Sequence, residues 1–157
     1  MPHSILQLRW ADYEDAFNVH VDGKLLANLV LVDVLKNAPD LKQHFVQETG
    51  IFWRFVNDPP PNTAFDDDAM KPGFKGDVMV GMCGCGVPSC GDWGITMESS
   101  DQLIVWSRYV DWRADRTCSI TPIVFDRSQY TAEVRAAAAR AAAENARFQA
   151  GGPSPCP

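Results

Sequence analysis

The sequence predicts an α+β domain, in which a mainly antiparallel sheet packs against a long C-terminal helix and one or two shorter helices. Segments that alternate apolar with polar residues, rich in β-branched and aromatic side chains, are typical of half-buried strands. The connections between several of them are short, which favours antiparallel neighbours. After residue 126 the pattern becomes alanine-rich and helical. We expect residues 1–150 to form a single α+β domain and residues 151–157 to be a disordered C-terminal tail.

Two strands are expected near the N-terminus. Segments 4–10 and 17–21 both alternate apolar with polar residues, as a half-buried strand does. Their apolar positions are Leu6, Leu8, Trp10, Phe17, Val19 and Val21. Asp22 and Gly23 follow as a tight-turn signal, so the second strand is expected to end there.

Residues 24–41 fit two patterns. The stretch LVLVDVL is rich in residues that favour strands, but the segment also has a helical period, and we interpret it as a helix. The positions on that period are Leu25, Leu29, Val32 and Lys36. Asp40 is then placed to cap a short second helix that carries Leu41, Phe45 and Val46 inward before Gly50.

A long surface loop is expected over residues 57–77, NDPPPNTAFDDDAMKPGFKGD, because the segment is rich in proline and glycine and has no periodicity. Its three consecutive aspartates, residues 66–68, lack the alternating oxygen ligands and distal glutamate of a calcium loop. We therefore interpret them as part of a solvated acidic loop.

Four strands and the long helix complete the predicted fold. The expected strands are DVMVGM (77–82), GITMES (94–99), QLIVWSRYVDW (102–112) and ITPIVF (120–125). Pro122 places the last of them at a sheet edge or a bulge. Asp126 and Gln129 have the spacing of a capping box at the helix start. The side chains expected to pack on the sheet are Tyr130, Val134, Ala138, Ala141 and Phe148, with Arg135, Arg140 and Arg147 solvated.

Charge limits the classes of partner. The net charge is −6, and it is uneven, because residues 1–126 carry 10 basic and 18 acidic side chains and residues 127–157 carry 4 and 2. An acidic body repels phosphate backbones, so we expect no nucleic-acid partner, and it attracts a basic protein partner. Oligomeric state does not follow from these observations.

The expected location is the cytoplasm. The N-terminus has no pattern of a secretory signal, and no apolar stretch reaches the roughly 18 residues that a membrane span needs, so we expect no membrane partner. Five cysteines cannot all pair within one chain, and a reducing compartment discourages disulfides. Metal binding, catalysis or plain burial must then account for the thiols.

Three of the cysteines lie within CGCGVPSCGDWG, between two expected strands. Cys83 and Cys85 are two residues apart and face one side of an extended chain, and Cys90 follows as the chain reverses at the tip of a hairpin. Structural zinc requires four ligands at roughly 2.3 Å. We expect Cys118 to be the fourth ligand, with Asp92, His3, His20 or His44 as alternatives, so the predicted cofactor is a structural zinc.

Two other interpretations of the thiols stay open. They can be free thiols in a tight turn that glycine and proline already explain, or they can be redox or catalytic groups. A nucleophilic cysteine needs a nearby base or a positive neighbour, which the flanking sequence lacks. Phosphate-binding, dinucleotide-binding, nucleophile-elbow and zinc-protease motifs are also absent from the sequence. The tryptophans at 53, 93, 106 and 112 are expected to fill the core rather than line a pocket.

Three stretches together resemble a group of small uncharacterised bacterial proteins. They are VGMCGCGVPSCGDWGITME, VWSRYVDW and VFDRSQYTAEV, within about residues 77–135, and VDG at 21–23 fits more loosely. Members carry a glycine-rich cysteine turn, a Val-Trp-Ser step in a strand and a Phe-Asp-Arg-x-Gln-Tyr helix start. The resemblance implies a small mixed α and β fold of bacterial cytoplasmic origin, and no established activity.

Small size, an acidic body and the absence of a catalytic motif favour a non-enzymatic binding protein. An immunity-type inhibitor that neutralises a basic toxin domain, or another basic partner, fits these properties. The alternative is a cysteine-dependent redox protein or a metal-dependent enzyme, in which the loop segment NDPPPNTAFDDD (57–68) acts as a lid.

Overall fold

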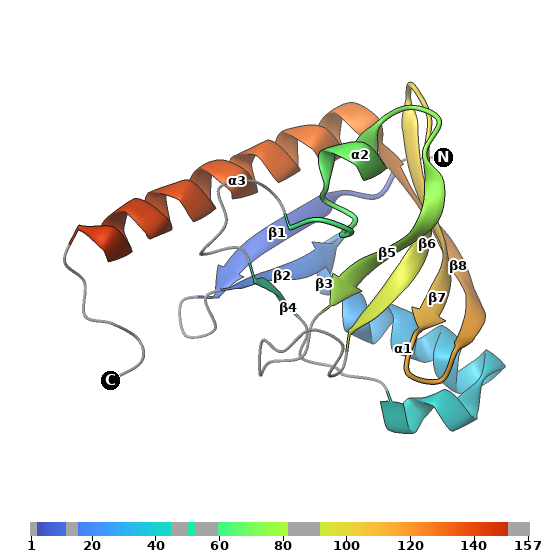
Figure 1. Cartoon of the computed structure of the whole chain (residues 1–157). Coiled ribbons are helices and arrows are strands. Elements are labelled where there is room, and N and C mark those ends of the chain that lie inside the picture. The colour runs from blue at the N-terminus through green and yellow to red at the C-terminus, as the bar shows by residue number, and fades with distance from the viewer. Residues whose placement is uncertain (1–2, 12–15, 45–49, 53–59, 82–91, 151–157) are drawn as a thin grey trace.

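The computed structural model describes residues 3–11, 16–44, 50–52, 60–81 and 92–150. Within these residues the chain forms two antiparallel sheets with helices packed against them, which confirms the α+β prediction (Figure 1). The first sheet contains β1 (Leu6–Ala11), β2 (Ala16–Val21), β3 (Lys24–Leu25) and β4 (Gly50–Phe52). The second contains β5 (Lys75–Gly81), β6 (Trp93–Ser99), β7 (Leu103–Asp111) and β8 (Arg116–Asp126), in that order. The helices are α1 (Leu26–Asn37), the 3-10 helix η1 (Pro39–His44), α2 (Asp67–Met70) and α3 (Arg127–Gln149).

β2 is the central strand of the first sheet. β1 pairs along one side of β2, and β3 and β4 pair with the opposite ends of its other side. The expected turn after β2 is present, with positive φ angles of 52° at Asp22 and 80° at Gly23. Because glycine and aspartate tolerate this backbone region, the two residues close a tight reversal into β3.

The second sheet contains the four strands expected after residue 77, and each neighbouring pair is antiparallel. β8 lies at one edge of this sheet. The β7–β8 register shifts between Trp106 and Arg108, so that Trp106 faces Ile123 and Arg108 faces Ser119. Pro122 falls in this irregular stretch of an edge strand, as its missing amide donor predicts.

The loop prediction for residues 57–77 is wrong in part, because the segment contains the one-turn helix α2 and the start of β5. Ala69 and Met70 are buried, and Ser99 Oγ donates a 2.6 Å hydrogen bond to the Ala69 carbonyl oxygen. This tertiary packing, which the sequence pattern does not reveal, orders the turn. The predicted lid therefore has a fixed part docked on β6.

The helix prediction for residues 26–37 is confirmed, but the buried face differs from the stripe that the period indicated. The buried residues are Leu26, Ala27, Val30 and Val34, whereas Val32 is 67% exposed. Eight of the twelve positions of α1 are apolar and they occur on several sides of the helix, so periodicity alone does not select the inner face. After α1, Leu41 of η1 is buried as expected, while Phe45 and Val46 lie outside the described residues.

Asp126 begins α3 as predicted, because its carboxylate accepts the Gln129 amide at 3.0 Å. The capping box is not reciprocal, since the Gln129 side chain instead bonds to the backbone of Leu6 in β1. The buried stripe of α3 is Tyr130, Val134, Ala137 and Ala141, with Ala138 partly buried. The Phe148 side chain and residues 151–157 lie outside the described part of the chain.

An aromatic cluster forms the centre of the core. Trp106 of β7 contacts Phe65, Phe125 and Tyr130 with ring centroids 4.8 to 6.5 Å apart. The Tyr130 hydroxyl donates a 2.6 Å hydrogen bond to the Ala64 carbonyl oxygen, which ties α3 to the segment before α2. Trp93 and Trp106 are buried as expected, Trp112 is 46% exposed, and Trp53 lies outside the described residues.

Among the helices of the described residues, none combines the length and the apolar composition that a membrane crossing requires.

Candidate functional site

Of the four cysteines predicted to bind zinc, the structure places Cys118. Cys83, Cys85 and Cys90 lie outside the described residues, between β5 and β6. Cys118 is buried on edge strand β8, opposite Tyr109, and its Sγ lies 3.9 Å from the Asp33 carbonyl oxygen of α1. The four-cysteine site stays a prediction. Its proposed fourth ligand, Cys118, lies on β8, which is the strand of this sheet farthest from β5.

The alternative fourth ligands lie on separate elements. His3 is exposed, and His20 lies on β2 with its Nδ1 3.4 Å from the Asn18 carbonyl oxygen. Burial lowers the pKa of His20 and so favours its neutral form. Asp92 immediately precedes β6, and the side chain of His44 is outside the described part of the chain. The described residues contain no group of three or more His, Cys, Asp or Glu side chains that could hold a metal ion.

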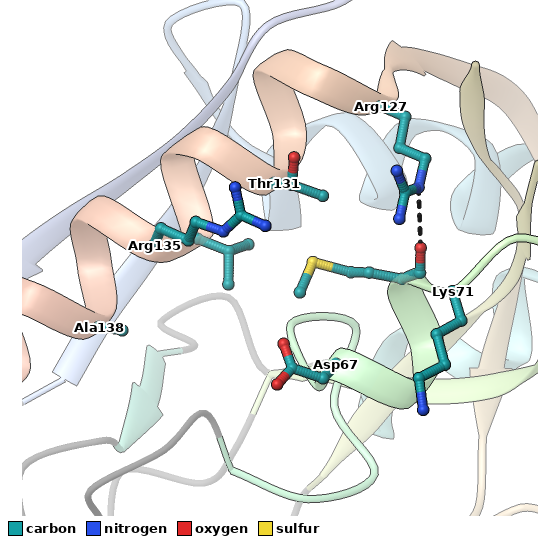
Figure 2. Close-up of a pocket in the computed structure, with 8 residues that line it drawn as sticks. Asp67, Lys71, Arg127, Thr131, Arg135 and Ala138 are labelled. Carbon is teal, nitrogen blue, oxygen red and sulfur yellow. Dashed lines mark hydrogen bonds between the residues drawn. The ribbon is translucent and has the colours of Figure 1, made fainter. Parts of the chain in front are cut away.

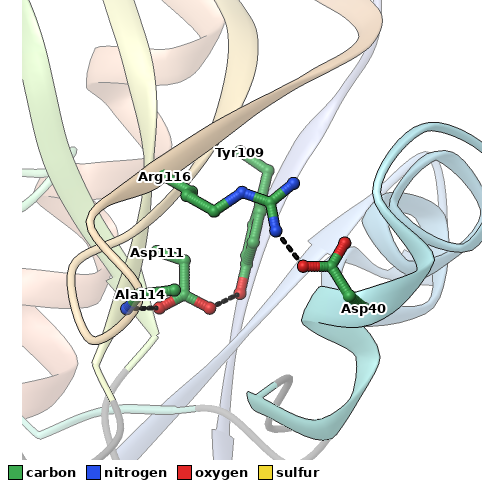
Figure 3. Close-up of polar contacts among 5 residues, drawn as sticks. All are labelled: Asp40, Tyr109, Asp111, Ala114 and Arg116. Atoms are coloured by element: carbon green, nitrogen blue, oxygen red, sulfur yellow. Dashed lines mark hydrogen bonds and ion pairs between the residues drawn. The ribbon is translucent and has the colours of Figure 1, made fainter.

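A polar cluster lies at the β7–β8 turn and includes Tyr109, the strand partner of Cys118 (Figure 3). Asp111, 3% exposed, accepts hydrogen bonds from the Tyr109 hydroxyl at 3.1 Å and from the Ala114 amide at 2.9 Å. Arg116 forms an ion pair with Asp40, which joins β8 to η1. These contacts close the β7–β8 turn and attach η1 to the sheet.

The chemistry of this cluster is that of a structural element rather than a nucleophilic site. Burial, followed by the nearby Asp33 carboxylate, raises the pKa of the Cys118 thiol. Burial and the charge of Asp111 raise the pKa of Tyr109 above its usual range, which keeps its hydroxyl a donor. A nucleophilic cysteine needs the opposite shift, towards thiolate at neutral pH. The surroundings of Cys118 therefore favour its neutral thiol form.

Zinc content tests the predicted metal site. Protein purified without added metal is expected to hold about one equivalent of zinc per chain, because four thiolates complete a structural zinc site. The Cys83→Ser/Cys85→Ser double variant is expected to lose the metal, and Cys118→Ser is expected to lose most of it. Elemental analysis and thiol titration of the folded protein measure both results.

Cys156→Ser is the matched control, because Cys156 is the one cysteine outside the predicted ligand set. It should leave the zinc content unchanged. Less than about a tenth of an equivalent in the wild-type chain, with all thiols titratable, would exclude the site. Zinc that survives Cys118→Ser would instead assign the fourth ligand to another residue.

A second candidate site is the groove between α1, β8 and the turn after β2, which has a volume of about 360 Å³. We call it the α1–β8 groove. Its walls are mostly apolar and consist of Ser4, Val21, Asp22, Leu29, Val30, Val32, Asp33, Ile120, Thr121, Pro122 and Ile123. Figure 1 shows α1 beside the lower part of β8.

Exposed apolar side chains gather at this groove. Val32 lines it at 67% exposure, Ile5 is next to the lining residue Ser4 at 52%, and Leu35, at 43%, follows the lining residue Val32 by three positions on α1. Large apolar side chains that stay in water at neighbouring positions are a feature of surfaces that bind a partner. The surface of α1 therefore differs from an ordinary solvated helix face.

Side-chain contacts to the backbone fix the shape of the groove. The Asp33 carboxylate accepts the Thr121 amide of β8 at 3.0 Å, and Asn37 Nδ2 donates to the Ser119 carbonyl oxygen at 3.0 Å. At the other end, Asp22 Oδ1 accepts the Ile5 amide at 2.8 Å. A groove held by such bonds keeps its shape without a ligand.

The charged residues that line the α1–β8 groove are both acidic, Asp22 and Asp33. The groove therefore combines an apolar floor with a negative rim. Such a surface complements an apolar side chain that is flanked by lysine or arginine.

The groove residues were not found from the sequence. The sequence pattern places Asp22 in a turn and Asp33 in a segment that fits two patterns, and neither position indicates a groove. The signal that could have found them is the apolar composition on all sides of α1, because a surface helix normally carries a polar face.

No protein-family model, curated protein or solved structure matches this chain. The resemblance to the small bacterial proteins described above stays an expectation.

Proposed function

We propose that this chain is a non-enzymatic binding protein for a basic protein partner, as an immunity protein is for a toxin domain, and that the α1–β8 groove is its contact surface. The observation that carries the proposal is the pair of exposed apolar side chains on α1, Val32 and Leu35, beside two acidic side chains that line the groove. The overall charge supports it, because a chain with a net charge of −6 attracts and orients a basic partner over a long range.

We expect a partner to bind the groove through its side chains rather than by adding a strand to β8. The outer backbone of β8 is already bonded to Asp33, to Asn37 and to the Ser4 amide, which donates to Val124 at 2.8 Å. Partners that bind by adding a strand need an edge with free donors and acceptors. The partner is therefore expected to insert an apolar side chain next to Val32 and to place its cations by Asp22 and Asp33.

Capture of a partner tests the proposal. The tagged protein, purified from its native host in low salt, is expected to retain a protein of high isoelectric point that high salt releases. Val32→Ser is expected to weaken binding of the purified partner about tenfold, because it removes one apolar contact of about 1.5 kcal/mol. Titration calorimetry with the identified partner measures the change.

Ala139→Ser is the matched control, because Ala139 is an exposed position of α3 that does not line the groove. It should bind as the wild type does. Equal binding by Val32→Ser and wild type would remove the groove from the proposal, and recovery of no basic protein at low salt would contradict the proposal itself.

An immunity role requires that the basic partner be a toxin. The captured protein should stop bacterial growth when it is expressed alone, and growth should recover when this chain is expressed with it. A partner without toxicity would leave a binding protein of another kind. A cytoplasmic location belongs to the proposal, and cell fractionation measures it.

A further inference from the structure

A second groove, on a different side of the fold, lies between α2 and α3 and has a volume of about 580 Å³. Arg127, Thr131 and Arg135 of α3 line one wall. Residues four apart share one face of a helix, so the three side chains form a row, and the two arginine Cα atoms lie about 12 Å apart along the axis. Asp67 and Lys71 line the opposite wall (Figure 2).

The basic side chains that line this groove differ in the contacts that they make. Arg127 is half-buried and donates from Nε to the Met70 carbonyl oxygen at 3.0 Å, which anchors one edge of its guanidinium. Figure 2 shows the guanidinium of Arg135 extending along the helix towards Thr131, with Asp67 across the gap. Lys71 is paired with Asp68 at 3.0 Å and so contributes little net charge.

The charge of the two groove arginines bears on what the groove can bind. Some arginines of the described residues form ion pairs, Arg116 with Asp40, and Arg140 and Arg147 with Glu144, while Arg9 bonds to the neutral Gln7 side chain. Within the same described part of the chain, Arg127 and Arg135 are in no such pair. Two guanidinium groups that line one groove supply a set of donors for anionic oxygen atoms.

We propose that the α2–α3 groove binds a small oxyanion group, a carboxylate or a phosphate, through Arg127 and Arg135. The guanidinium nitrogens donate to the oxygens from two sides, whereas the Thr131 hydroxyl on the same wall already donates to the Ser128 carbonyl oxygen at 3.2 Å. Asp67, on the facing wall, opposes a second negative charge on the ligand. The groove shares no lining residue with the α1–β8 groove, so the inference does not depend on the proposed partner.

Titration with acetate and with inorganic phosphate, at constant ionic strength held by chloride, tests the inference. Backbone amide NMR signals of residues 127–135 should shift saturably, with millimolar dissociation constants because the groove is open. Arg135→Gln should raise the dissociation constant about tenfold. Tighter binding of acetate would identify a carboxylate ligand, and tighter binding of phosphate a phosphorylated one.

Arg108→Gln is the charge-matched control, because Arg108 is an exposed arginine of β7 outside the groove. It should leave both dissociation constants unchanged. Asp67→Asn should improve phosphate binding more than acetate binding, since it removes the opposing charge. Shifts that do not saturate, or equal losses in Arg135→Gln and Arg108→Gln, would show an adventitious ion only and overturn the proposal.

Discussion

Gly94→Ala is expected to lower the free energy of unfolding by about 3 kcal/mol or more, because the second sheet has no room for a methyl group there. A Cβ at position 94 would lie inside van der Waals contact with the Val78 carbonyl oxygen, 2.9 Å from the Val78 carbonyl carbon and 2.5 Å from the Trp112 ring. The Val78 carbonyl group belongs to the backbone of the neighbouring strand β5, so it can move away only if the hydrogen bonds between β5 and β6 break. Chemical denaturation measures the loss.

Gly76→Ala is the matched control on the adjacent strand. A Cβ at position 76 would meet the far end of the Phe74 ring at 3.2 Å, and that side chain can move aside. We expect a change within about 1 kcal/mol, since alanine also restricts the unfolded chain. Equal losses in the two variants would show that the close approach of Val78 to Gly94 is not what requires glycine.

Local rules predicted the parts of this fold that depend on local sequence. Alternation identified β1, β2 and the strands after residue 77, and Asp126 marked the start of α3. What local rules did not predict is that the strands divide into two sheets, because strand pairing joins residues far apart in the chain. Ser4 at the N-terminus, for example, is bonded to Val124 of β8.

The same limit applies to the two grooves. The α2–α3 groove exists because Asp67–Met70 is helical, and burial of Ala69 and Met70 against β6 orders a segment that reads as a loop. Arg135 was correctly placed on the solvated face of α3, but its neighbour across the groove, Asp67, is 68 positions away in the chain. Periodicity describes one element at a time and does not show which elements meet.

One edge strand of each sheet is covered in the same way. Two polar side chains, four residues apart on a helix, bond to the outer backbone of an edge strand. On β8 they are Asp33 and Asn37 of α1. On β1 they are Gln129 and Glu133 of α3, which bond to the backbone of Leu6 and Leu8 at 2.8 to 3.1 Å. Each helix thus takes the place of a missing neighbour strand.

Removal of the pair on β1 is expected to have the second large effect. Gln129→Ala/Glu133→Ala should lower the free energy of unfolding by about 3 kcal/mol, because three hydrogen bonds are lost, one of them to a carboxylate. The uncovered edge should also promote self-association, since unpaired donors and acceptors bind other strands. Denaturation and sedimentation measure the two effects.

Glu133→Gln separates the hydrogen bond from the mere presence of the side chain, because its amide oxygen can still accept the Leu8 amide. It should retain more stability than Glu133→Ala and should slow hydrogen exchange at Leu8 relative to that variant. The covering role is wrong if the double variant stays within about 0.5 kcal/mol of the wild type, or if Leu6 and Leu8 exchange no faster in it. In either case the backbone of β1 would be protected by its pairing with β2 alone, and α3 would contribute to the sheet only through its buried apolar stripe.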